Sequence, residues 1–202
     1  MATDAELLHA WREGDREAGN QLFQGHFEAI RRFFVNKADR DVEDPVQRTF
    51  IGCVEGSDRF EGRASFRTYL FAIANNVLRE FYRRKRRDER IDFGSCSVVD
   101  LGAGPSSVVA EQQEQRALLE ALRCVPLEFQ VALELYYWEK LTGAELGEAL
   151  GVPENTARSR LRRGKELLAE ALTRLEQSHR VLESTDADLE GWAAGIRAGL
   201  DG

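Results

Sequence analysis

Apolar residues recur three and four positions apart along almost the whole chain, and this spacing restricts the fold more than any other feature. Phe23, Phe27, Ile30 and Phe34 follow it, and no segment shows the alternation of a half-buried strand. We therefore expect an all-α protein. The expected helices cover residues 3–13, 15–35, about 65–87, and a series that resumes around 108.

Another helix is expected to begin at Asp44. Asp44 would be its N-cap, with Pro45 first and Gln47 third in the helix, which is a capping arrangement. The stretch at 55–64, EGSDRFEGRA, is then expected to be a loop.

The composition changes at a Gly- and Ser-rich stretch without periodicity, IDFGSCSVVDLGAGPSS, at 91–107. Such a composition is typical of a linker. We expect two small helical domains at 1–90 and 108–175, joined by a flexible linker at 91–107. Residues 176–202 form an acidic C-terminal extension with its own helical spacing, so a short further helix is expected there.

In the second domain, two expected helices are separated by a very short turn. The first, TGAELGEAL, ends at Gly151, and Pro153 lies in the first turn of the next. This pattern predicts a helix-turn-helix. On the second helix, Ala157, Leu161 and Leu168 share one face. The other faces carry polar and basic side chains: Thr156, Arg158, Ser159, Arg162, Arg163 and Lys165.

Positive charge is concentrated in two short segments of an acidic chain. Residues 79–90 and 155–168 each have a net charge of +4, whereas the whole chain has −7, so the remainder carries −15. A basic helix alone is often only a solvated surface. Preceded by the helix-turn-helix pattern, this one is suited to the major groove, where Arg can pair with guanine. The charge distribution therefore points to nucleic acid.

The sequence contains no motif that indicates catalysis. There is no phosphate-binding Gly loop and no nucleophile–base pair, and the three cysteines and three histidines form no metal-ligand pattern. No apolar run reaches the ~18 residues that span a membrane, and the N-terminus lacks a signal-peptide core. We expect a cytoplasmic protein that is not an enzyme and that holds no metal or other cofactor.

Both domains resemble parts of one protein family. Residues 122–168, from LRCVPLEFQ to RGKELL, resemble region 4 of an extracytoplasmic-function (ECF) RNA polymerase sigma factor, and residues 41–87, from DVEDPVQRTF to YRRKRR, resemble its region 2. The resemblance implies a subunit that binds core RNA polymerase at the β′ clamp and β flap. It also implies recognition of the −35 and −10 promoter elements and strand opening. The alternative is a stand-alone helix-turn-helix transcriptional regulator, which would leave the basic segment at 79–90 unexplained.

The resemblance also assigns roles to individual residues. It implies that Asp41, Asp44, Gln47 and Phe50 bind core polymerase, although Pro45 and Arg48 depart from the family pattern. The −35 element would be read by the six polar residues of the second helix, with Arg158 and Arg163 at base-contacting positions. The expected −10 residues are Phe60, Arg63, Phe66, Arg67, Tyr69, Asn76, Arg79 and Arg83. For Phe66 and Tyr69, a position in the core is the alternative.

The extension at 176–202 lies beyond the resemblance. It has a net charge of −4, and Leu189, Trp192 and Ile196 recur at helical spacing. We expect it to fold back on a basic DNA-binding surface and restrain the free protein. It could instead extend the second domain or contact the polymerase, and the sequence leaves open whether a separate anti-sigma factor exists.

Overall fold

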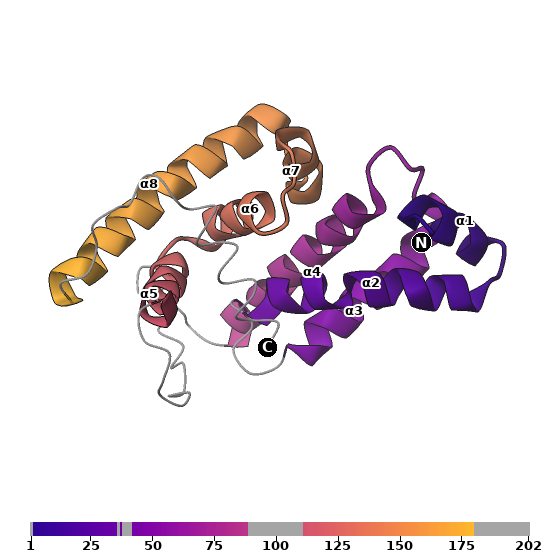
Figure 1. The fold of residues 1–202 in the computed structure, drawn as a ribbon, viewed down its shortest axis with the longest axis horizontal. Helices are drawn as coiled ribbons and strands as arrows, with labels where there is room; N and C mark the ends of the chain where they lie inside the picture. The colour runs from indigo at the N-terminus through magenta and orange to yellow at the C-terminus, as the bar shows by residue number, and fades with distance from the viewer. Residues whose placement is uncertain (1, 36, 38–41, 89–110, 180–202) are drawn as a thin grey trace. The chain divides into compact units, whose positions relative to one another are not determined.

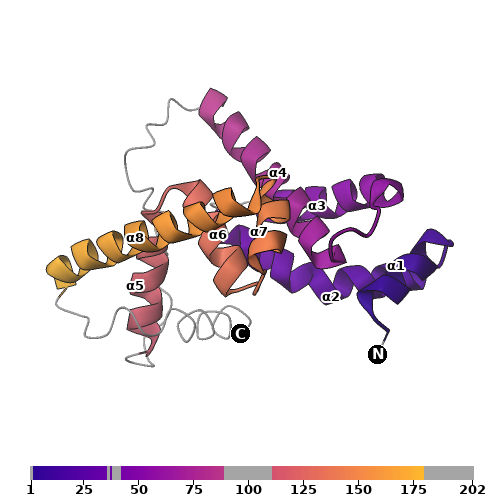
Figure 2. The same ribbon diagram turned by 90° about the horizontal axis from the view of Figure 1, so that it is seen from above.

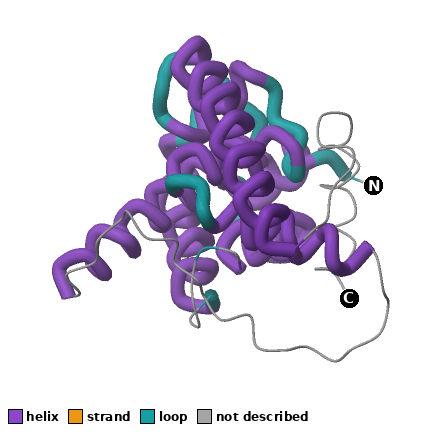
Figure 3. Tube along the Cα trace, turned by 90° about the vertical axis from the view of Figure 1, so that its left-hand side faces the viewer, coloured by secondary structure: helices purple, strands orange, loops and turns teal. Residues whose placement is uncertain are grey.

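The computed structural model describes residues 2–35, 37, 42–88 and 111–179. Every regular element among them is helical (Figures 1 and 3), which confirms the all-α prediction for this part of the chain. The expected linker at 91–107 and the part of the C-terminal extension beyond residue 179 lie outside the described residues. The chain divides into two compact units: Met1–Arg90 with Ala144–Glu154, and Ile91–Gly143 with Asn155–Gly202.

Most of the first unit is built from four helices. They are α1 (Asp4–Arg12), α2 (Arg16–Val35), α3 (Glu43–Gly56) and α4 (Phe66–Asp88), with a short 3-10 turn, η1, at Ser57–Arg59. α1 packs against α2 and α3 packs against α4 (Figure 2). Between α2 and α4, the rings of Phe33 and Phe71 meet at 5.8 Å. Six of the largest fully buried side chains of this unit come from the same two helices: Leu22, Ile30, Phe34, Leu70, Phe71 and Leu78.

The start of α3 differs from the expectation. The helix begins at Glu43 after Val42, with no side-chain cap, so the prediction that Asp44 is the N-cap is wrong. Pro45 becomes the third helical residue. Proline is tolerated there because the first four amides of a helix have no intrahelical acceptor. α3 and η1 also extend to residue 59, so the expected loop is shorter than 55–64.

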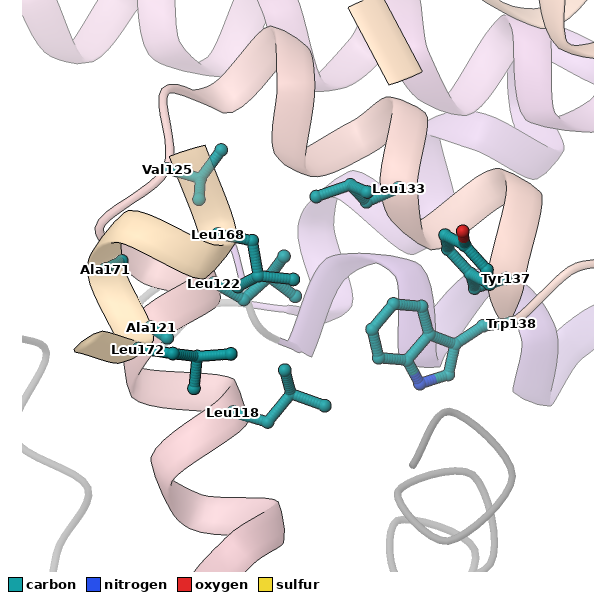
Figure 4. Close-up of a cluster of buried hydrophobic side chains, with 10 residues drawn as sticks. All are labelled: Leu118, Ala121, Leu122, Val125, Leu133, Tyr137, Trp138, Leu168, Ala171 and Leu172. Atoms are coloured by element: carbon teal, nitrogen blue, oxygen red, sulfur yellow. The ribbon is translucent and has the colours of Figure 1, made fainter. Parts of the chain in front are cut away.

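The core of the second unit is formed by α5 (Glu111–Arg123), α6 (Leu127–Tyr137) and α8 (Glu154–His179). α6 is apolar on nearly all sides, as expected for a helix surrounded by others, and its residues 130–135 are all buried. Figure 4 shows the side chains that the three helices and the adjoining turns contribute: Leu118, Ala121, Leu122, Val125, Leu133, Tyr137, Trp138, Leu168, Ala171 and Leu172.

Candidate nucleic-acid and partner interfaces

A short turn at residues 151–153 precedes α8. α7 (Gly143–Leu150) ends in a Schellman motif, with the amides of Gly151 and Val152 donating to the carbonyls of Glu148 and Gly147 at 3.1 and 2.9 Å. Gly151 has φ +66°, which a residue with a Cβ adopts only with strain. α8 begins at Glu154, so Pro153 lies immediately before it, one position earlier than expected.

α8 has the two faces that the sequence predicts. Ala157, Leu168 and Leu172 are buried, and Leu161 is half-buried against the core of the second unit. The six residues expected to read the −35 element are all exposed: Thr156, Arg158, Ser159, Arg162, Arg163 and Lys165. The structure therefore brings them together on the solvent side of one helix.

Acidic and aromatic neighbours engage part of this surface. Arg163 pairs with Glu166 at 2.9 Å and Glu170 at 3.7 Å, and its hydrogen bond to Glu166 raises the pKa of the guanidinium. The ammonium of Lys165 lies 5.2 Å from the ring centre of Tyr137 on α6. These contacts hold two of the six side chains close to the protein, so DNA would have to compete for them.

In the first unit, the expected −10 residues lie in the loop from η1 to α4 and along α4 itself. Ser65 begins α4 as an N-cap does, because its hydroxyl accepts the amide of Thr68 at 3.1 Å. Phe60 stacks on Tyr69 with ring centres 4.5 Å apart and lies edge-on to Phe66 at 6.4 Å. Phe60 and Phe66 are buried, whereas Tyr69 is half-buried. The aromatic rings thus pack beneath the loop. Phe66 lies in the core, which was the alternative to a role in −10 contact.

The polar members of the −10 set are more accessible. Arg63, Asn76, Arg79 and Arg83 are exposed, and Arg67 is half-buried with its guanidinium 5.8 Å from the ring centre of Phe71. Asn75, the neighbour that could be confused with Asn76, is buried. Only Asn76 of that pair therefore faces solvent.

A groove lies on the surface of α2 and α3. Its volume is about 1150 Å³, and Gln47 and Phe50 line it together with three exposed apolar side chains, Phe27, Ile51 and Val54. Phe50 contacts the rings of Phe23 and Phe27 at 5.3 and 6.1 Å, so it is half-buried. Asp44 is exposed one turn before Gln47, and Asp41 lies outside the described residues.

Sequence reasoning missed the apolar part of this groove. The signal was present, because Gln47, Ile51 and Val54 are spaced i, i+4 and i+7 and so share one helical face. Charged residues edge the groove: Glu28, Arg31, Glu43 and Glu55.

Arg48, which departs from the family pattern, points toward α4 and not into the groove. Its guanidinium pairs with one oxygen of Glu80 at 2.6 Å, and Arg84 pairs with the other at 2.6 Å. Desolvation raises the pKa of Glu80, but the two arginines outweigh it and lower the pKa below its ordinary value. The unusual charge at position 48 therefore joins α3 to α4.

The described residues contain neither a metal-ligand cluster nor a membrane-spanning helix. No three His, Cys, Asp or Glu side chains among them are grouped to hold a metal ion. Nor does any helix in these parts of the chain have the length and apolar character needed to cross a bilayer.

Comparison with known proteins gives matches to both units. Residues 26–88 match Sigma-70 region 2, and residues 115–168 match Sigma-70 region 4. The RNA polymerase sigma factor NccH of Alcaligenes xylosoxydans xylosoxydans is 30% identical over 189 residues, which are 89% of this chain and 98% of NccH. The ECF RNA polymerase sigma-E factor of Haemophilus influenzae is 24% identical over 176 residues, 82% of this chain and 93% of that protein.

A solved structure has a similar fold. The sigma factor RpoE, in a complex with the anti-sigma factor NepR from Bartonella quintana, matches with a TM-score of 0.58 and 22% identity. The match covers 76% of this chain and 96% of RpoE.

Proposed function

The chain belongs to the extracytoplasmic-function family of RNA polymerase sigma factors, and from this we propose which of its surfaces carry each step of transcription initiation. The protein binds core RNA polymerase and promoter DNA, and it directs the polymerase to −35 and −10 elements where strands open. We infer that the polymerase supplies the chemistry of RNA synthesis and that this chain supplies promoter choice.

The observation that carries this function is the presence of both matched regions in one chain, region 2 before region 4. A stand-alone regulator needs only the helix-turn-helix. Run-off transcription with purified core polymerase tests the difference, using a template library randomised at both promoter elements. We expect transcripts only when core and this chain are both present. Tight binding of the free chain to duplex DNA, without transcription in the complete system, would instead indicate a regulator.

We propose that the groove on α2 and α3 is the docking site for the β′ clamp. Exposed apolar side chains such as Phe27, Ile51 and Val54 usually mark an interaction surface when they are contiguous. Three carboxylates at its edge, on Glu28, Glu43 and Glu55, suit a partner helix with basic flanks. Asp41, Asp44, Gln47 and Phe50 belong to the same proposed surface.

Ile51→Ser is a sharper test of this surface than Phe50→Ala, because Phe50 also packs against Phe23 and its loss would disturb the fold. Ala5→Ser, at an exposed position of α1 that does not line the groove, is the control. We expect Ile51→Ser to weaken competition for core polymerase, with thermal stability unchanged and the control behaving as wild type. Wild-type affinity in the folded variant would contradict the assignment.

We propose that α8 reads the −35 element and that the loop between η1 and α4 holds the opened −10 strand. The exposed stripe on α8 supports the first assignment, and the aromatic cluster with accessible basic residues around it supports the second. Arg158→Ala should lower the affinity for a matched −35 element by ~1–3 kcal/mol, the scale of a base-specific contact. If Arg158→Ala transcribes as well as the wild type from every −35 variant, that contact is ruled out. The second unit is also proposed to dock on the β flap.

A restraining partner is also proposed. The relative RpoE was crystallised with the anti-sigma factor NepR, which supports a search for a protein that covers the same surfaces in this chain. The acidic extension at 176–202 is the intramolecular candidate for that role. Its residues after 179 lie outside the described part of the chain.

A further inference from the structure

α1 lies before the residues that match region 2, yet it contacts the loop assigned to the −10 element. Its last residue, Arg12, reaches the end of η1, where its Nη2 donates to the carbonyls of Ser57 and Phe60. These two carbonyls belong to the first residue of η1 and to the residue that follows η1, where the chain enters the loop. One side chain from α1 therefore fixes the backbone at the start of the loop.

The same side chain also contacts the aromatic cluster. The guanidinium carbon of Arg12 lies 5.8 Å from the ring centre of Phe60, and Phe60 in turn stacks on Tyr69 at 4.5 Å. The hydroxyl of Tyr69 lies against Gly56, where a Cβ would approach it to 2.3 Å. Arg12, Phe60 and Tyr69 thus form a stack whose far end is seated on the last residue of α3.

α1 is itself held firmly enough to act as a support. Thr3 and Glu6 form a capping box at its start, and Asp4 pairs with His26 of α2 at 2.8 Å. Near its end, Trp11 meets Phe23 of α2 edge-on at 5.1 Å. Arg12 therefore projects from a helix anchored at both ends, so its position relative to the loop is defined.

A guanidinium suits this position because it is planar and always charged, so it can donate to carbonyls and cover a ring at once. Hydrogen bonds from a charged donor are also stronger than neutral ones. Loss of Arg12 would release the turn and uncover one side of Phe60, while the buried core of α2 and α4 would remain.

We propose that Arg12 is a positioning residue for −10 recognition: it acts through Phe60 and the turn at Ser57 to hold the loop in the shape that selects bases of the opened strand. This inference rests on the proposed −10 surface and extends it to a residue outside the matched region. It predicts a defect confined to the −10 element.

The test uses the full chain assembled with core polymerase and a template library randomised at the −10 and −35 elements, with transcripts counted by sequencing. Arg12→Ala and Arg12→Lys are compared with wild type and with Arg16→Ala, a matched control at the exposed first residue of α2. We expect Arg12→Ala to reduce discrimination between −10 bases about tenfold, because two charge-assisted hydrogen bonds are lost. The −35 preference and core affinity should stay unchanged. Arg12→Lys should rescue little, since an ammonium lacks the planar fork.

The −35 preference is the internal control against a merely structural role. An unaltered −10 preference in both Arg12 variants would overturn the proposal. A parallel loss at both elements that follows a fall in thermal stability would overturn it as well. If the wild-type chain yields no transcripts, the proposed function itself fails. That result is distinct from the failure of this inference alone, in which the wild type transcribes and the Arg12 variants select the same −10 bases as the wild type.

Discussion

Several basic side chains assigned to DNA contacts have acidic neighbours in the free protein. Arg63 pairs with Glu61 at 2.5 Å and Arg163 pairs with Glu166 at 2.9 Å, and all four side chains are at least half exposed. Exposed pairs of this kind contribute little to stability, so a phosphate or a base edge can displace them. The carboxylates therefore lower the general attraction for DNA and leave the stronger, specific contacts available.

This view predicts the effect of Glu166→Gln. Arg163 would no longer be held by its neighbour, and a negative charge would be removed from the DNA-facing side of α8. Holoenzyme should bind −35 duplexes about two- to fivefold more tightly, the scale of an exposed ion pair. Fluorescence anisotropy at two salt concentrations would measure it. In an Arg163→Ala background the same change should give a smaller gain, because only the general effect of the lost charge remains, and an undiminished gain would contradict the competition.

A second residue-scale prediction concerns Cys53, which is fully buried in α3. Burial raises the pKa of its thiol from 9.0 to about 12, so the thiolate fraction at neutral pH falls about a thousandfold. Iodoacetamide should leave Cys53 unmodified in the native protein and alkylate it rapidly in denaturant. Mass spectrometry of the peptide containing Cys53 measures this, and rapid native labelling would show that α3 opens locally.

At the scale of elements, helical spacing predicted the described helices well because their burial is periodic: Leu22, Ile30 and Phe34 all point into one core. The start of α3 was not predictable, since Asp44 and Pro45 form an acceptable cap by sequence, and only packing decides that the helix begins at Glu43. The partner of Arg48 was hidden for a similar reason. Glu80 is 32 residues away in sequence, and only the packing of α3 on α4 brings the two together.

The candidate site was predicted in part. The exposed stripe on α8 follows from helical periodicity alone. The aromatic residues of the loop were harder, because a Phe beside a loop can face either a base or the core, and Phe60 and Phe66 are buried. Arg12 was missed, because a contact from α1 to a backbone carbonyl has no sequence signature.

The link between α3 and α4 should depend on pH. Because Arg48 and Arg84 lower the pKa of Glu80, the native state favours its ionised form. The stability contributed by Glu80 is present in full above its unfolded pKa of about 4.5 and is lost as the pH falls through the lower native value. Urea unfolding at a series of pH values should therefore show wild type more stable than Glu80→Gln near neutrality, with the difference vanishing in acid.

Glu55→Gln, at an exposed position of α3, is the control. Its difference from wild type should be small at every pH. A Glu80→Gln difference that persists unchanged into acid would mean that packing, and not the charge pair, joins the two helices.

At the scale of the whole molecule, the net charge of −7 opposes binding of the free chain to DNA, although two segments carry +4 each. We propose that polymerase overcomes this by holding both proposed DNA-binding surfaces at one promoter. The second contact then becomes intramolecular and gains from a high effective concentration. Free chain should consequently bind DNA weakly, and anything that covers one basic segment would weaken it further.

The acidic extension is the part of this chain best suited to cover such a segment. Deleting residues 180–202 leaves α8 entire, because that helix ends at His179. If the extension restrains the basic stripe on α8, the deletion should raise promoter binding about fivefold or more, the lower scale of coupling between sites. Replacing Asp186, Asp188 and Glu190 by their amides keeps the length and should reproduce the gain if charge carries the restraint. The gain should also shrink with added salt, which weakens such attraction in the wild type.

A fall in thermal stability of the deletion variant would instead indicate a terminal helix that completes the second unit. Lost transcription with stability intact would indicate a polymerase contact, and either result would exclude autoinhibition.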